Sequence, residues 1–273
     1  MDHVDLREHE HLSYEYSRHE KPDRPGFFMH LHDQMEVYYL VEGNVEYHVE
    51  NHVYLPQAGD MMIMRAGELH TSQVHVEHGG PYERYNLRFS PELLKESLNS
   101  RLLLPFLSRP AGEFNHYSSS EIPSDYIRTC FQRMFSRHDR DDGTRAAAFL
   151  IPILQEIYDV WLTREKPQKK PLDSLPTEII SYINQNLATL RGPQDLSKVF
   201  FLSQSQIYRV FREYTGTSIW NYVRTKRLIT ARELMQNGEP PSKAAAACGF
   251  DDYSTFYRAY RKQFGCSPQE DLR

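Results

Sequence analysis

The N-terminal half carries residues whose types and spacing are typical of a metal site or a polar ligand site. His30-x-His32-x3-Glu36 is followed, after two glycine-containing turns, by His70. On a strand His30 and His32 would point to one side, and Glu36 and His70 could converge there from neighbouring strands. Three imidazoles and one carboxylate are a donor set that suits iron, zinc, manganese, nickel or copper.

Three interpretations of this cluster stay open. The residues could bind a divalent transition metal, or hydrogen-bond a small polar effector with no cofactor required, or be core histidines satisfied by backbone carbonyls. Tyr38 alternates onto the predicted Glu36 face, and Arg88 lies on a candidate inward face of its strand. We therefore predict an effector site at His30, His32, Glu36, Tyr38, His70 and Arg88, with the three histidines and Glu36 as the candidate metal ligands.

A segment with basic, aromatic and hydroxyl side chains occurs twice near the C-terminus. Residues 201–218 and 250–267 align without a gap at an offset of 49 positions. A fixed period indicates two copies of one structural unit. Arginine can bond guanine bidentately, and hydroxyl groups can bond bases or phosphates, so the repeated side chains favour DNA binding. The matched pairs include Ser205 and Ser254, Tyr208 and Tyr257, Arg209 and Arg258, and Arg212 and Arg261.

Each copy predicts a helix-turn-helix unit. Short helices over 194–200 and 242–248 precede the repeated helices, for which Ser203 and Asp252 are the expected N-caps. A connecting helix over 219–236 would be about 27 Å long at about 1.5 Å per residue. Adjacent major-groove segments lie about 34 Å apart, so the two second helices could enter successive grooves. The alternative, a helical repeat protein with solvated arginines, normally needs three or more copies.

The elements that must position the histidine cluster are strands. Residues from about 26 to 89 alternate and are broken by turns, with a predicted hairpin at Glu42-Gly43-Asn44. Short strands with regular turns favour a small sandwich or barrel. Helical spacing follows over 91–107, 124–138 and 144–162. The last segment is apolar nearly all round, which predicts a dimer interface or a helix buried against its own barrel.

Charge and composition separate two domains. The chain has 273 residues and a net charge of -5; residues 1–173 carry -9 and residues 174–273 carry +4, and all 13 histidines lie between His3 and His138. We expect different partners for the two parts. A proline- and lysine-rich stretch predicts a linker at 165–176, between domains 1–164 and 177–273. The mean hydropathy of -0.65, with no apolar run near membrane-span length and three scattered cysteines, predicts a cytoplasmic protein with no membrane partner.

Residues 177–273 resemble the double helix-turn-helix domain of the AraC/XylS family of bacterial transcription regulators. The matching stretches are DLSKVFFLSQSQIYRVFREYTGTS, the connector residues Tyr222, Arg227, Ala231 and Leu234, and CGFDDYSTFYRAYRKQFGCSP. The resemblance implies base-facing positions, to which we add Arg212 and Arg261. The implied positions are Ser205, Gln206, Tyr208 and Arg209 in the first unit and Tyr253, Ser254, Thr255, Tyr257 and Arg258 in the second. The spacing of the histidine motif in turn resembles the signature of cupin barrels.

These observations together predict an α+β protein of two domains: a cupin-like β-barrel with following helices, and an all-α double helix-turn-helix domain. We expect a homodimeric transcription regulator that binds promoter DNA sequence-specifically and responds to a small effector such as a sugar. As an activator it would contact RNA polymerase. It is not expected to be an enzyme. The alternative is a cupin metalloenzyme, a dioxygenase or an isomerase, with an accessory nucleic-acid-binding domain.

Overall fold

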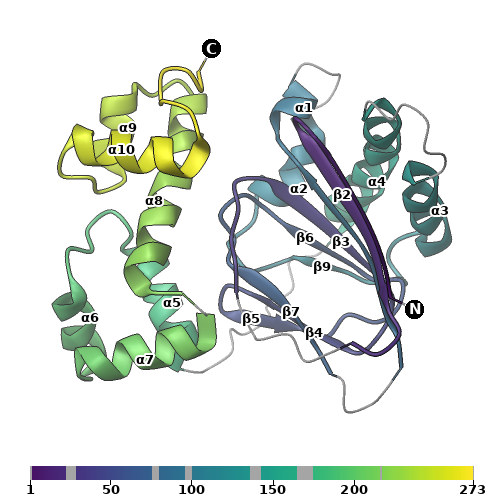
Figure 1. Cartoon of the computed structure of the whole chain (residues 1–273), viewed down its shortest axis with the longest axis horizontal. Coiled ribbons are helices and arrows are strands. Elements are labelled where there is room, and N and C mark those ends of the chain that lie inside the picture. Colours follow the sequence, from purple (N-terminus) through teal and green to yellow (C-terminus); the bar gives the residue numbers. More distant parts are fainter. Residues whose placement is uncertain are drawn as a thin grey trace. The chain divides into compact units, whose positions relative to one another are not determined.

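The computed structural model describes residues 2–22, 29–75, 80–95, 100–135, 143–164, 175–215 and 217–272 (Figure 1). The chain divides into two compact units, 1–26 with 31–171, and 172–273 with 27–30. Most of the predicted linker, residues 165–174, lies outside the described residues. The helix α5 (Leu175–Gln185) begins within the last two positions of that linker.

The described part of the first unit is built on two antiparallel sheets. The larger has the strand order β1-β2-β8-β3-β6-β9, and the smaller has the order β5-β4-β7. Their strands are β1 (His3–His9), β2 (Leu12–His19), β3 (Met35–Glu42), β4 (Val45–Val49), β5 (His52–Tyr54), β6 (Met61–Met64), β7 (His70–Val74), β8 (Tyr82–Phe89) and β9 (His116–Tyr117).

The first two strands lie outside the range in which strands were predicted. β2 pairs with β8 along its whole length, from Leu12 opposite Phe89 to His19 opposite Tyr82. Its sequence LSYEYSRH does alternate, so a signal was present. The extra pair extends the large sheet beyond β8.

The predicted hairpin at residues 42–44 is wrong. Gly43, with φ of 133°, does join β3 to β4 closely, but the two strands do not pair with each other. β3 pairs with β6 and β8, whereas β4 pairs with β5 and β7. The turn therefore passes the chain from one sheet to the other, because side chains of both strands must face a shared interior.

The large sheet is covered differently on its two faces. On one face Val37 and Tyr39 of β3 join a core with α3 (Ser124–Met134) and α4 (Thr144–Thr163). On the other face Tyr38 and Leu40 pack with residues of the small sheet, such as Tyr47. Shorter helical segments lie at α1 (Glu92–Lys95), η2 (Ser100–Leu103) and α2 (Leu104–Leu107). The predicted sheet-rich domain with following helices is confirmed, and its strand ladders form two sheets packed face to face.

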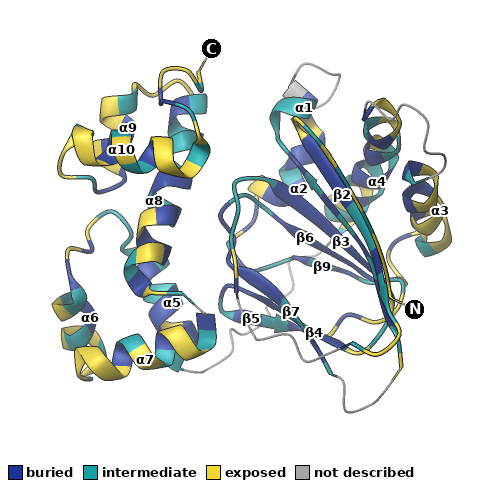
Figure 2. Ribbon diagram, in the orientation of Figure 1, coloured by how far each residue is buried: buried dark blue, intermediate teal, exposed yellow. Residues whose placement is uncertain are grey.

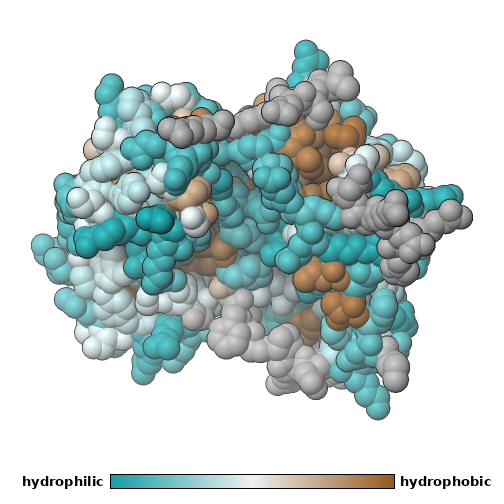
Figure 3. All heavy atoms as spheres, turned by 45° about the horizontal axis from the view of Figure 1, so that its top comes forward, coloured by the Kyte–Doolittle hydropathy of each residue, from teal (hydrophilic) through white to brown (hydrophobic). Residues whose placement is uncertain are grey.

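Helix α4 corrects the expectation that no segment approaches the length of a membrane span. Its 20 residues are long and apolar enough to cross a bilayer. Ala146, Leu150, Ile153, Leu154 and Ile157 are nevertheless buried in the core of the first unit. The helix is therefore a core helix on one side, while Ile151 and Leu162 on α4 are exposed. Figure 3 shows apolar patches on one face of the molecule.

The second unit is all-helical, as predicted. Its remaining helices are α6 (Pro193–Phe200), α7 (Gln204–Thr215), α8 (Ile219–Gln236), α9 (Pro241–Ala247) and α10 (Tyr253–Phe264). Figure 1 shows α8 joining the α6–α7 pair to the α9–α10 pair. Both N-cap predictions are confirmed: Ser203 Oγ accepts from the Gln206 backbone N–H at 3.3 Å, and Asp252 accepts from the Thr255 N–H at 2.8 Å.

Candidate functional site

Helix α7 presents a polar face to solvent and an apolar face to the second unit. Ile207 and Phe211 are buried, whereas Arg209 and Arg212 are exposed. Figure 2 shows both buried and exposed positions along α7. Ser205 is exposed as well. The helical period separates the two sets because positions three and four apart share a face. The polar face predicted for the first recognition helix is therefore exposed to solvent at Ser205, Arg209 and Arg212.

Two of the predicted contact residues on α7 are already engaged in local bonds. The Gln206 side-chain oxygen accepts from the Ser203 N–H at 3.1 Å and from its hydroxyl at 2.8 Å, which closes the helix N-terminus. The Tyr208 hydroxyl accepts from Trp220 Nε1 at 2.7 Å. Tyr208 is half-buried and ties the recognition helix to the start of α8.

Helix α10 repeats this arrangement. Ser254, Thr255, Arg258 and Arg261 are exposed, Tyr253 and Tyr257 are half-buried, and Phe256 and Tyr260 are buried. Tyr253 accepts a hydrogen bond from Gln269 at 3.0 Å. Among the residues that the structure describes, none forms a hydrogen bond or ion pair with the guanidinium groups of Arg209, Arg212, Arg258 or Arg261. Four exposed cationic side chains thus remain available to an anionic partner.

A polar hollow of about 510 Å³ lies beside the end of α7 and the start of α8. Arg224 donates to Asn221 at 2.8 Å, and Ser218 caps the helix by accepting from the Asn221 N–H. Only Arg212 among its lining residues was predicted from the sequence as a contact residue. Trp220, Asn221 and Arg224 belong to the connecting helix α8, which the repeat does not cover. The lining consists of Arg212, Thr217, Ser218, Trp220, Asn221 and Arg224.

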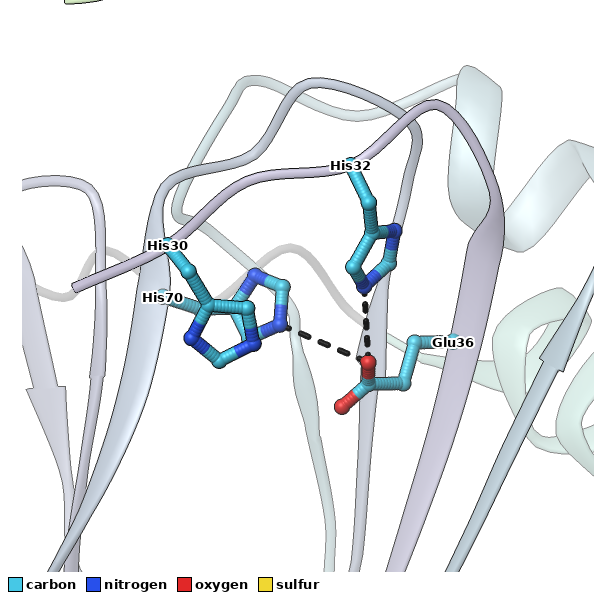
Figure 4. Close-up of side chains that lie close together, drawn as sticks. All are labelled: His30, His32, Glu36 and His70. Carbon is cyan, nitrogen blue, oxygen red and sulfur yellow. Dashed lines mark hydrogen bonds and ion pairs between the residues drawn. The ribbon is translucent and has the colours of Figure 1, made fainter. Parts of the chain in front are cut away.

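The predicted histidine–glutamate cluster is assembled (Figure 4). Candidate ligand atoms of His30, His32, Glu36 and His70 all lie within 4.8 Å of one another. Glu36 is the second residue of β3, His70 begins β7 in the other sheet, and His30 and His32 precede β3. Glu36 and His70 are almost fully buried, at 2% and 1% exposure.

The hydrogen bonds fix which ring nitrogens face the centre. His32 Nδ1 lies 3.0 Å from the Gln34 carbonyl oxygen, and His70 Nδ1 lies 2.8 Å from that of Glu68. A carbonyl only accepts, so each Nδ1 carries the proton. Each Nε2 then points at Glu36 Oε2, at 2.8 Å from His32 and 3.5 Å from His70.

This geometry calls for a positive charge at its centre. A neutral imidazole with its proton on Nδ1 and an ionised carboxylate are both acceptors, so the 2.8 Å contact needs a shared proton or a bound cation. Burial alone raises the pKa of Glu36, but the charges and hydrogen bonds of His70 and His32 hold this pKa well below 4.5. Burial lowers the pKa of His70, but Glu36 outweighs it and raises this pKa above 6.5.

The other two predicted effector residues also face the space between the sheets. Tyr38 follows Glu36 by two positions and bonds the Tyr82 hydroxyl at 3.2 Å. Arg88 stands opposite Glu36 in the β3–β8 register, and its neighbours Leu87 and Phe89 face the helices, so Arg88 faces the small sheet. Among the described residues, none accepts a hydrogen bond from Arg88.

Sequence reasoning missed three members of this polar network. Tyr47 donates to Glu36 Oε1 at 3.2 Å, and Arg84 bonds the Tyr82 hydroxyl at 3.3 Å and Glu15 at 3.1 Å. Tyr47, Tyr82 and Arg84 lie on β4 and β8, and their alternation onto the Glu36 side was the available signal. The network therefore extends from the histidines across both sheets.

Comparison with protein families decides what these two sites belong to. Residues 14–151 match the family model described as an AraC-like ligand binding domain, and residues 196–273 match a helix-turn-helix domain. The chain belongs to the AraC family of transcription regulators. The paired helix-turn-helix units of this AraC-family regulator are thus its DNA-binding domain, and the two-sheet unit is its ligand-binding domain.

Two transcription regulators and one solved structure are similar to this chain. The regulator is 24% identical over 251 residues to the HTH-type transcriptional activator RhaR of Yersinia pestis bv. Antiqua, covering 89% of this chain and 84% of that protein. It is 40% identical over 91 residues to the probable transcriptional regulator LumQ of Photobacterium leiognathi, covering 33% of this chain and 37% of LumQ. Apo ToxT K231A of Vibrio cholerae aligns over 97% of this chain and 98% of its own at 14% identity, with a TM-score of 0.44.

Proposed function

We propose that this AraC-family regulator reads promoter DNA with α7 and α10 and is switched by a small polar effector held between its two sheets. The observation that carries the proposal is the repeated exposed face, with Arg209 and Arg258 at equivalent positions 49 residues apart. Effector binding would act by favouring one arrangement of the two domains, or of two subunits, over another.

For direct base reading we propose Ser205 and Arg209 in α7, and Ser254, Thr255 and Arg258 in α10, because all five side chains are exposed. An exposed arginine can bond guanine bidentately in the major groove. The half-buried Tyr208, Tyr253 and Tyr257, together with Gln206, would pack against thymine methyls or position their neighbours. The two remaining cations, Arg212 and Arg261, stand one turn further along and suit backbone phosphates.

We propose that the hollow at the start of α8 also holds a DNA phosphate. Arg212 and Arg224 supply two cations, and the N-terminus of an 18-residue helix adds its partial positive charge. Trp220 links this hollow to the recognition helix through Tyr208. A phosphate held there would fix the depth at which α7 sits in the groove.

For the effector we propose a small polar molecule, with sugars as the first class to test. The space between the sheets offers ring nitrogens, a carboxylate, hydroxyls and guanidinium groups, and such mixed donors and acceptors suit a polyhydroxylated molecule. His30, His32, Glu36, Tyr38, His70 and Arg88 remain the proposed contacts. The sugar class rests on the resemblance to sugar sensors of this family.

A divalent transition metal is the second proposed occupant of the cluster. His32 and His70 have their Nδ1 protons held by carbonyls and present Nε2 to a buried carboxylate, which is how metal-binding histidines are oriented. With His30 these residues form a three-histidine, one-carboxylate set that fits the group. When bound, the metal would supply a Lewis acid that an oxygen of the effector could approach.

The same cluster keeps the enzyme alternative testable. A cupin dioxygenase or isomerase would use these four residues for turnover, with the helix-turn-helix domain as an accessory. We propose instead that the chain is a regulator without catalytic activity, because the match to an AraC-like ligand binding domain covers the sheets that hold the cluster. Stoichiometric iron together with substrate turnover would favour the enzyme.

We further propose a cytoplasmic homodimer that activates transcription through contact with RNA polymerase. The dimer surface would be the uncovered side of α4, where Ile151 and Leu162 are 40% and 58% exposed. Tyr158 and Trp161 stack nearby with ring centroids 5.9 Å apart and extend this apolar side. Activation is proposed from the name of the RhaR relative, which matches this chain over most of its length.

A gel-shift titration against the DNA upstream of the coding region tests the proposal. The regulator should bind that DNA in preference to unrelated DNA, and candidate sugars should change the affinity. Binding that ignores both sequence and effector would leave the proposed function without support.

A further inference from the structure

One arginine of the connecting helix α8 bonds to the segment that precedes the first helix-turn-helix unit and to the turn inside the second. Arg227 Nε donates to the Leu187 carbonyl at 2.8 Å, and one of its terminal nitrogens donates to the Leu190 carbonyl at 2.6 Å. Both carbonyls belong to the segment between α5 and α6. The other terminal nitrogen donates to the Gly249 carbonyl at 2.8 Å, in the turn between α9 and α10. The Arg227 side chain therefore joins the α5–α6 segment, the connecting helix α8 and the α9–α10 turn.

The backbones of the two units also touch at this point. Gly249 has a φ of 82°, and a Cβ placed on it would lie 2.3 Å from the Ala188 carbonyl oxygen. Only glycine fits that approach, because real Cβ atoms do not come so close and L-residues rarely adopt this φ. At the exposed rim, Arg191 and Asp251 form an ion pair of 2.8 Å. The contact between the units is thus built from backbone as well as side chain.

The guanidinium group is what completes this contact chemically. Its planar fork reaches three carbonyl oxygens at once, whereas a lysine ammonium on a similar stem cannot match that geometry. Burial, and secondarily the neighbouring Arg191, lower the pKa of Arg227. Removing the group would leave carbonyls at the contact without their donor.

The connector is held at both ends as well. Tyr222 donates to Asn184 Oδ1 of α5 at 2.8 Å, and Leu228, Ala231 and Met235 pack in one core with residues of α9 and α10. A helix of 18 residues with one bonded unit at each end could still let those units rotate. The Arg227 bonds and the Gly249 approach remove that freedom.

We infer that Arg227 is a positioning residue that fixes the separation of α7 and α10, so that the domain accepts two DNA elements at one spacing only. The inference rests on the proposed binding of DNA by both helices. Two units that moved independently would instead tolerate changes in the DNA between the elements, because the effective concentration of the second unit would vary little with spacing.

The first experiment measures the separation without DNA. Spin labels at Glu213→Cys in α7 and Gln263→Cys in α10, in a Cys266→Ser background, report the distance distribution. We expect a narrow distribution in the parent, and a clearly broader one in Arg227→Lys and in Gly249→Ala. The matched control Arg191→Ala, which removes only an exposed ion pair, should stay narrow. Equal widths in all four proteins, each with an intact helical melting transition, would overturn the inference.

The second experiment uses operator DNA selected by the parent protein. Inserting two base pairs between the elements rotates one against the other by about 70° and should weaken parent binding by at least about tenfold. Arg227→Lys should bind the uninterrupted operator more weakly, bind each isolated element as the parent does, and lose little on insertion. A parent-like spacing profile in Arg227→Lys would contradict the positioning role. A parent protein that selects no DNA sequence would contradict the proposed function itself. The distances between the spin labels would still test whether Arg227 fixes the separation of α7 and α10.

Discussion

The Nε2 atom of His32 lies 2.8 Å from Oε2 of Glu36, while the Nδ1 atom of the same ring faces the Gln34 carbonyl. Both atoms of the shorter contact are acceptors unless a proton or a cation lies between them. This contact in the first domain therefore needs a positive charge, next to the space where we propose that the effector binds.

Addition of a divalent metal tests whether the cluster binds a cation. We expect Zn²⁺ or Ni²⁺ to raise the melting temperature of the full chain, because binding to the folded state at about 100 times Kd stabilises it by about 2.7 kcal/mol. His70→Ala should remove the increase, whereas His11→Ala, an exposed histidine outside the cluster, should retain it. An equal increase in both variants would assign the metal to other sites.

The effector proposal predicts a separable loss in His32→Ala. The variant should lose the response of DNA binding to sugar while keeping basal affinity for DNA, because His32 belongs to the first unit and the DNA-binding helices to the second. Titration of wild type and variant with the same sugar, followed by gel shift, measures this. An unchanged response in the variant would remove His32 from the site.

The DNA interface predicts two kinds of loss. Arg209→Ala and Arg258→Ala should each cost about 1–3 kcal/mol, confined to the base position that each reads. Arg224→Ala should weaken binding to every sequence and lower the slope of log affinity against log salt by about 1. Arg128→Ala, an exposed arginine on α3, is the charge-matched control and should leave the slope unchanged. If Arg209→Ala and Arg258→Ala also weakened binding equally to every sequence, Arg209 and Arg258 would contact the DNA backbone rather than bases.

The uncovered side of α4 predicts the oligomeric state. Ile151→Glu combined with Leu162→Glu should convert a dimer into a monomer in sedimentation equilibrium, because burying two carboxylates in an apolar interface is unfavourable. Tyr126→Glu, at an exposed aromatic on α3, should remain dimeric. A dimer that survives the α4 change would place the interface elsewhere.

The buried pair of Glu68 and Arg109 predicts the acid stability of the first domain. Burial raises the pKa of Glu68, but Arg109 outweighs this and brings the pKa to about 2. A folded-state pKa below the ordinary 4.5 gives stability that is present above pH 4.5 and lost as the pH falls toward 2. The shift corresponds to about 3 kcal/mol. Denaturant unfolding of wild type should show this loss and Glu68→Gln should not; the exposed control Glu8→Gln should follow wild type. If the free energy of unfolding of the wild type did not fall in acid, the Glu68–Arg109 pair would not determine the acid stability of this domain.

Much of the second domain could be predicted because its information is local and repeated. The 49-residue period locates α7 and α10, and the apolar positions Ile207 and Phe256 orient them. The repeat could not predict how the connecting helix contacts the helix-turn-helix units. Trp220 bonds Tyr208 and Arg227 bonds Gly249, and both contacts depend on tertiary packing.

The first domain shows where local patterns fail. The turn at Gly43 has hairpin chemistry, yet its strands enter different sheets because both must face the shared interior. The histidine motif did identify the residues that come together, since a period of two and one later histidine suffice. For Tyr47 and Arg84 the alternation only indicated the face of the strand, and strand pairing determines which residues they contact.

The central claim is that two equivalent arginine-bearing helices read one duplex. Its most direct test is a gel-shift titration of wild type, Arg209→Ala and Arg258→Ala against the upstream DNA and against unrelated DNA at one salt concentration. We predict that wild type prefers the upstream DNA by at least about 1,000-fold and that each variant loses part of that preference. Equal affinity of all three proteins for both DNAs would contradict the account.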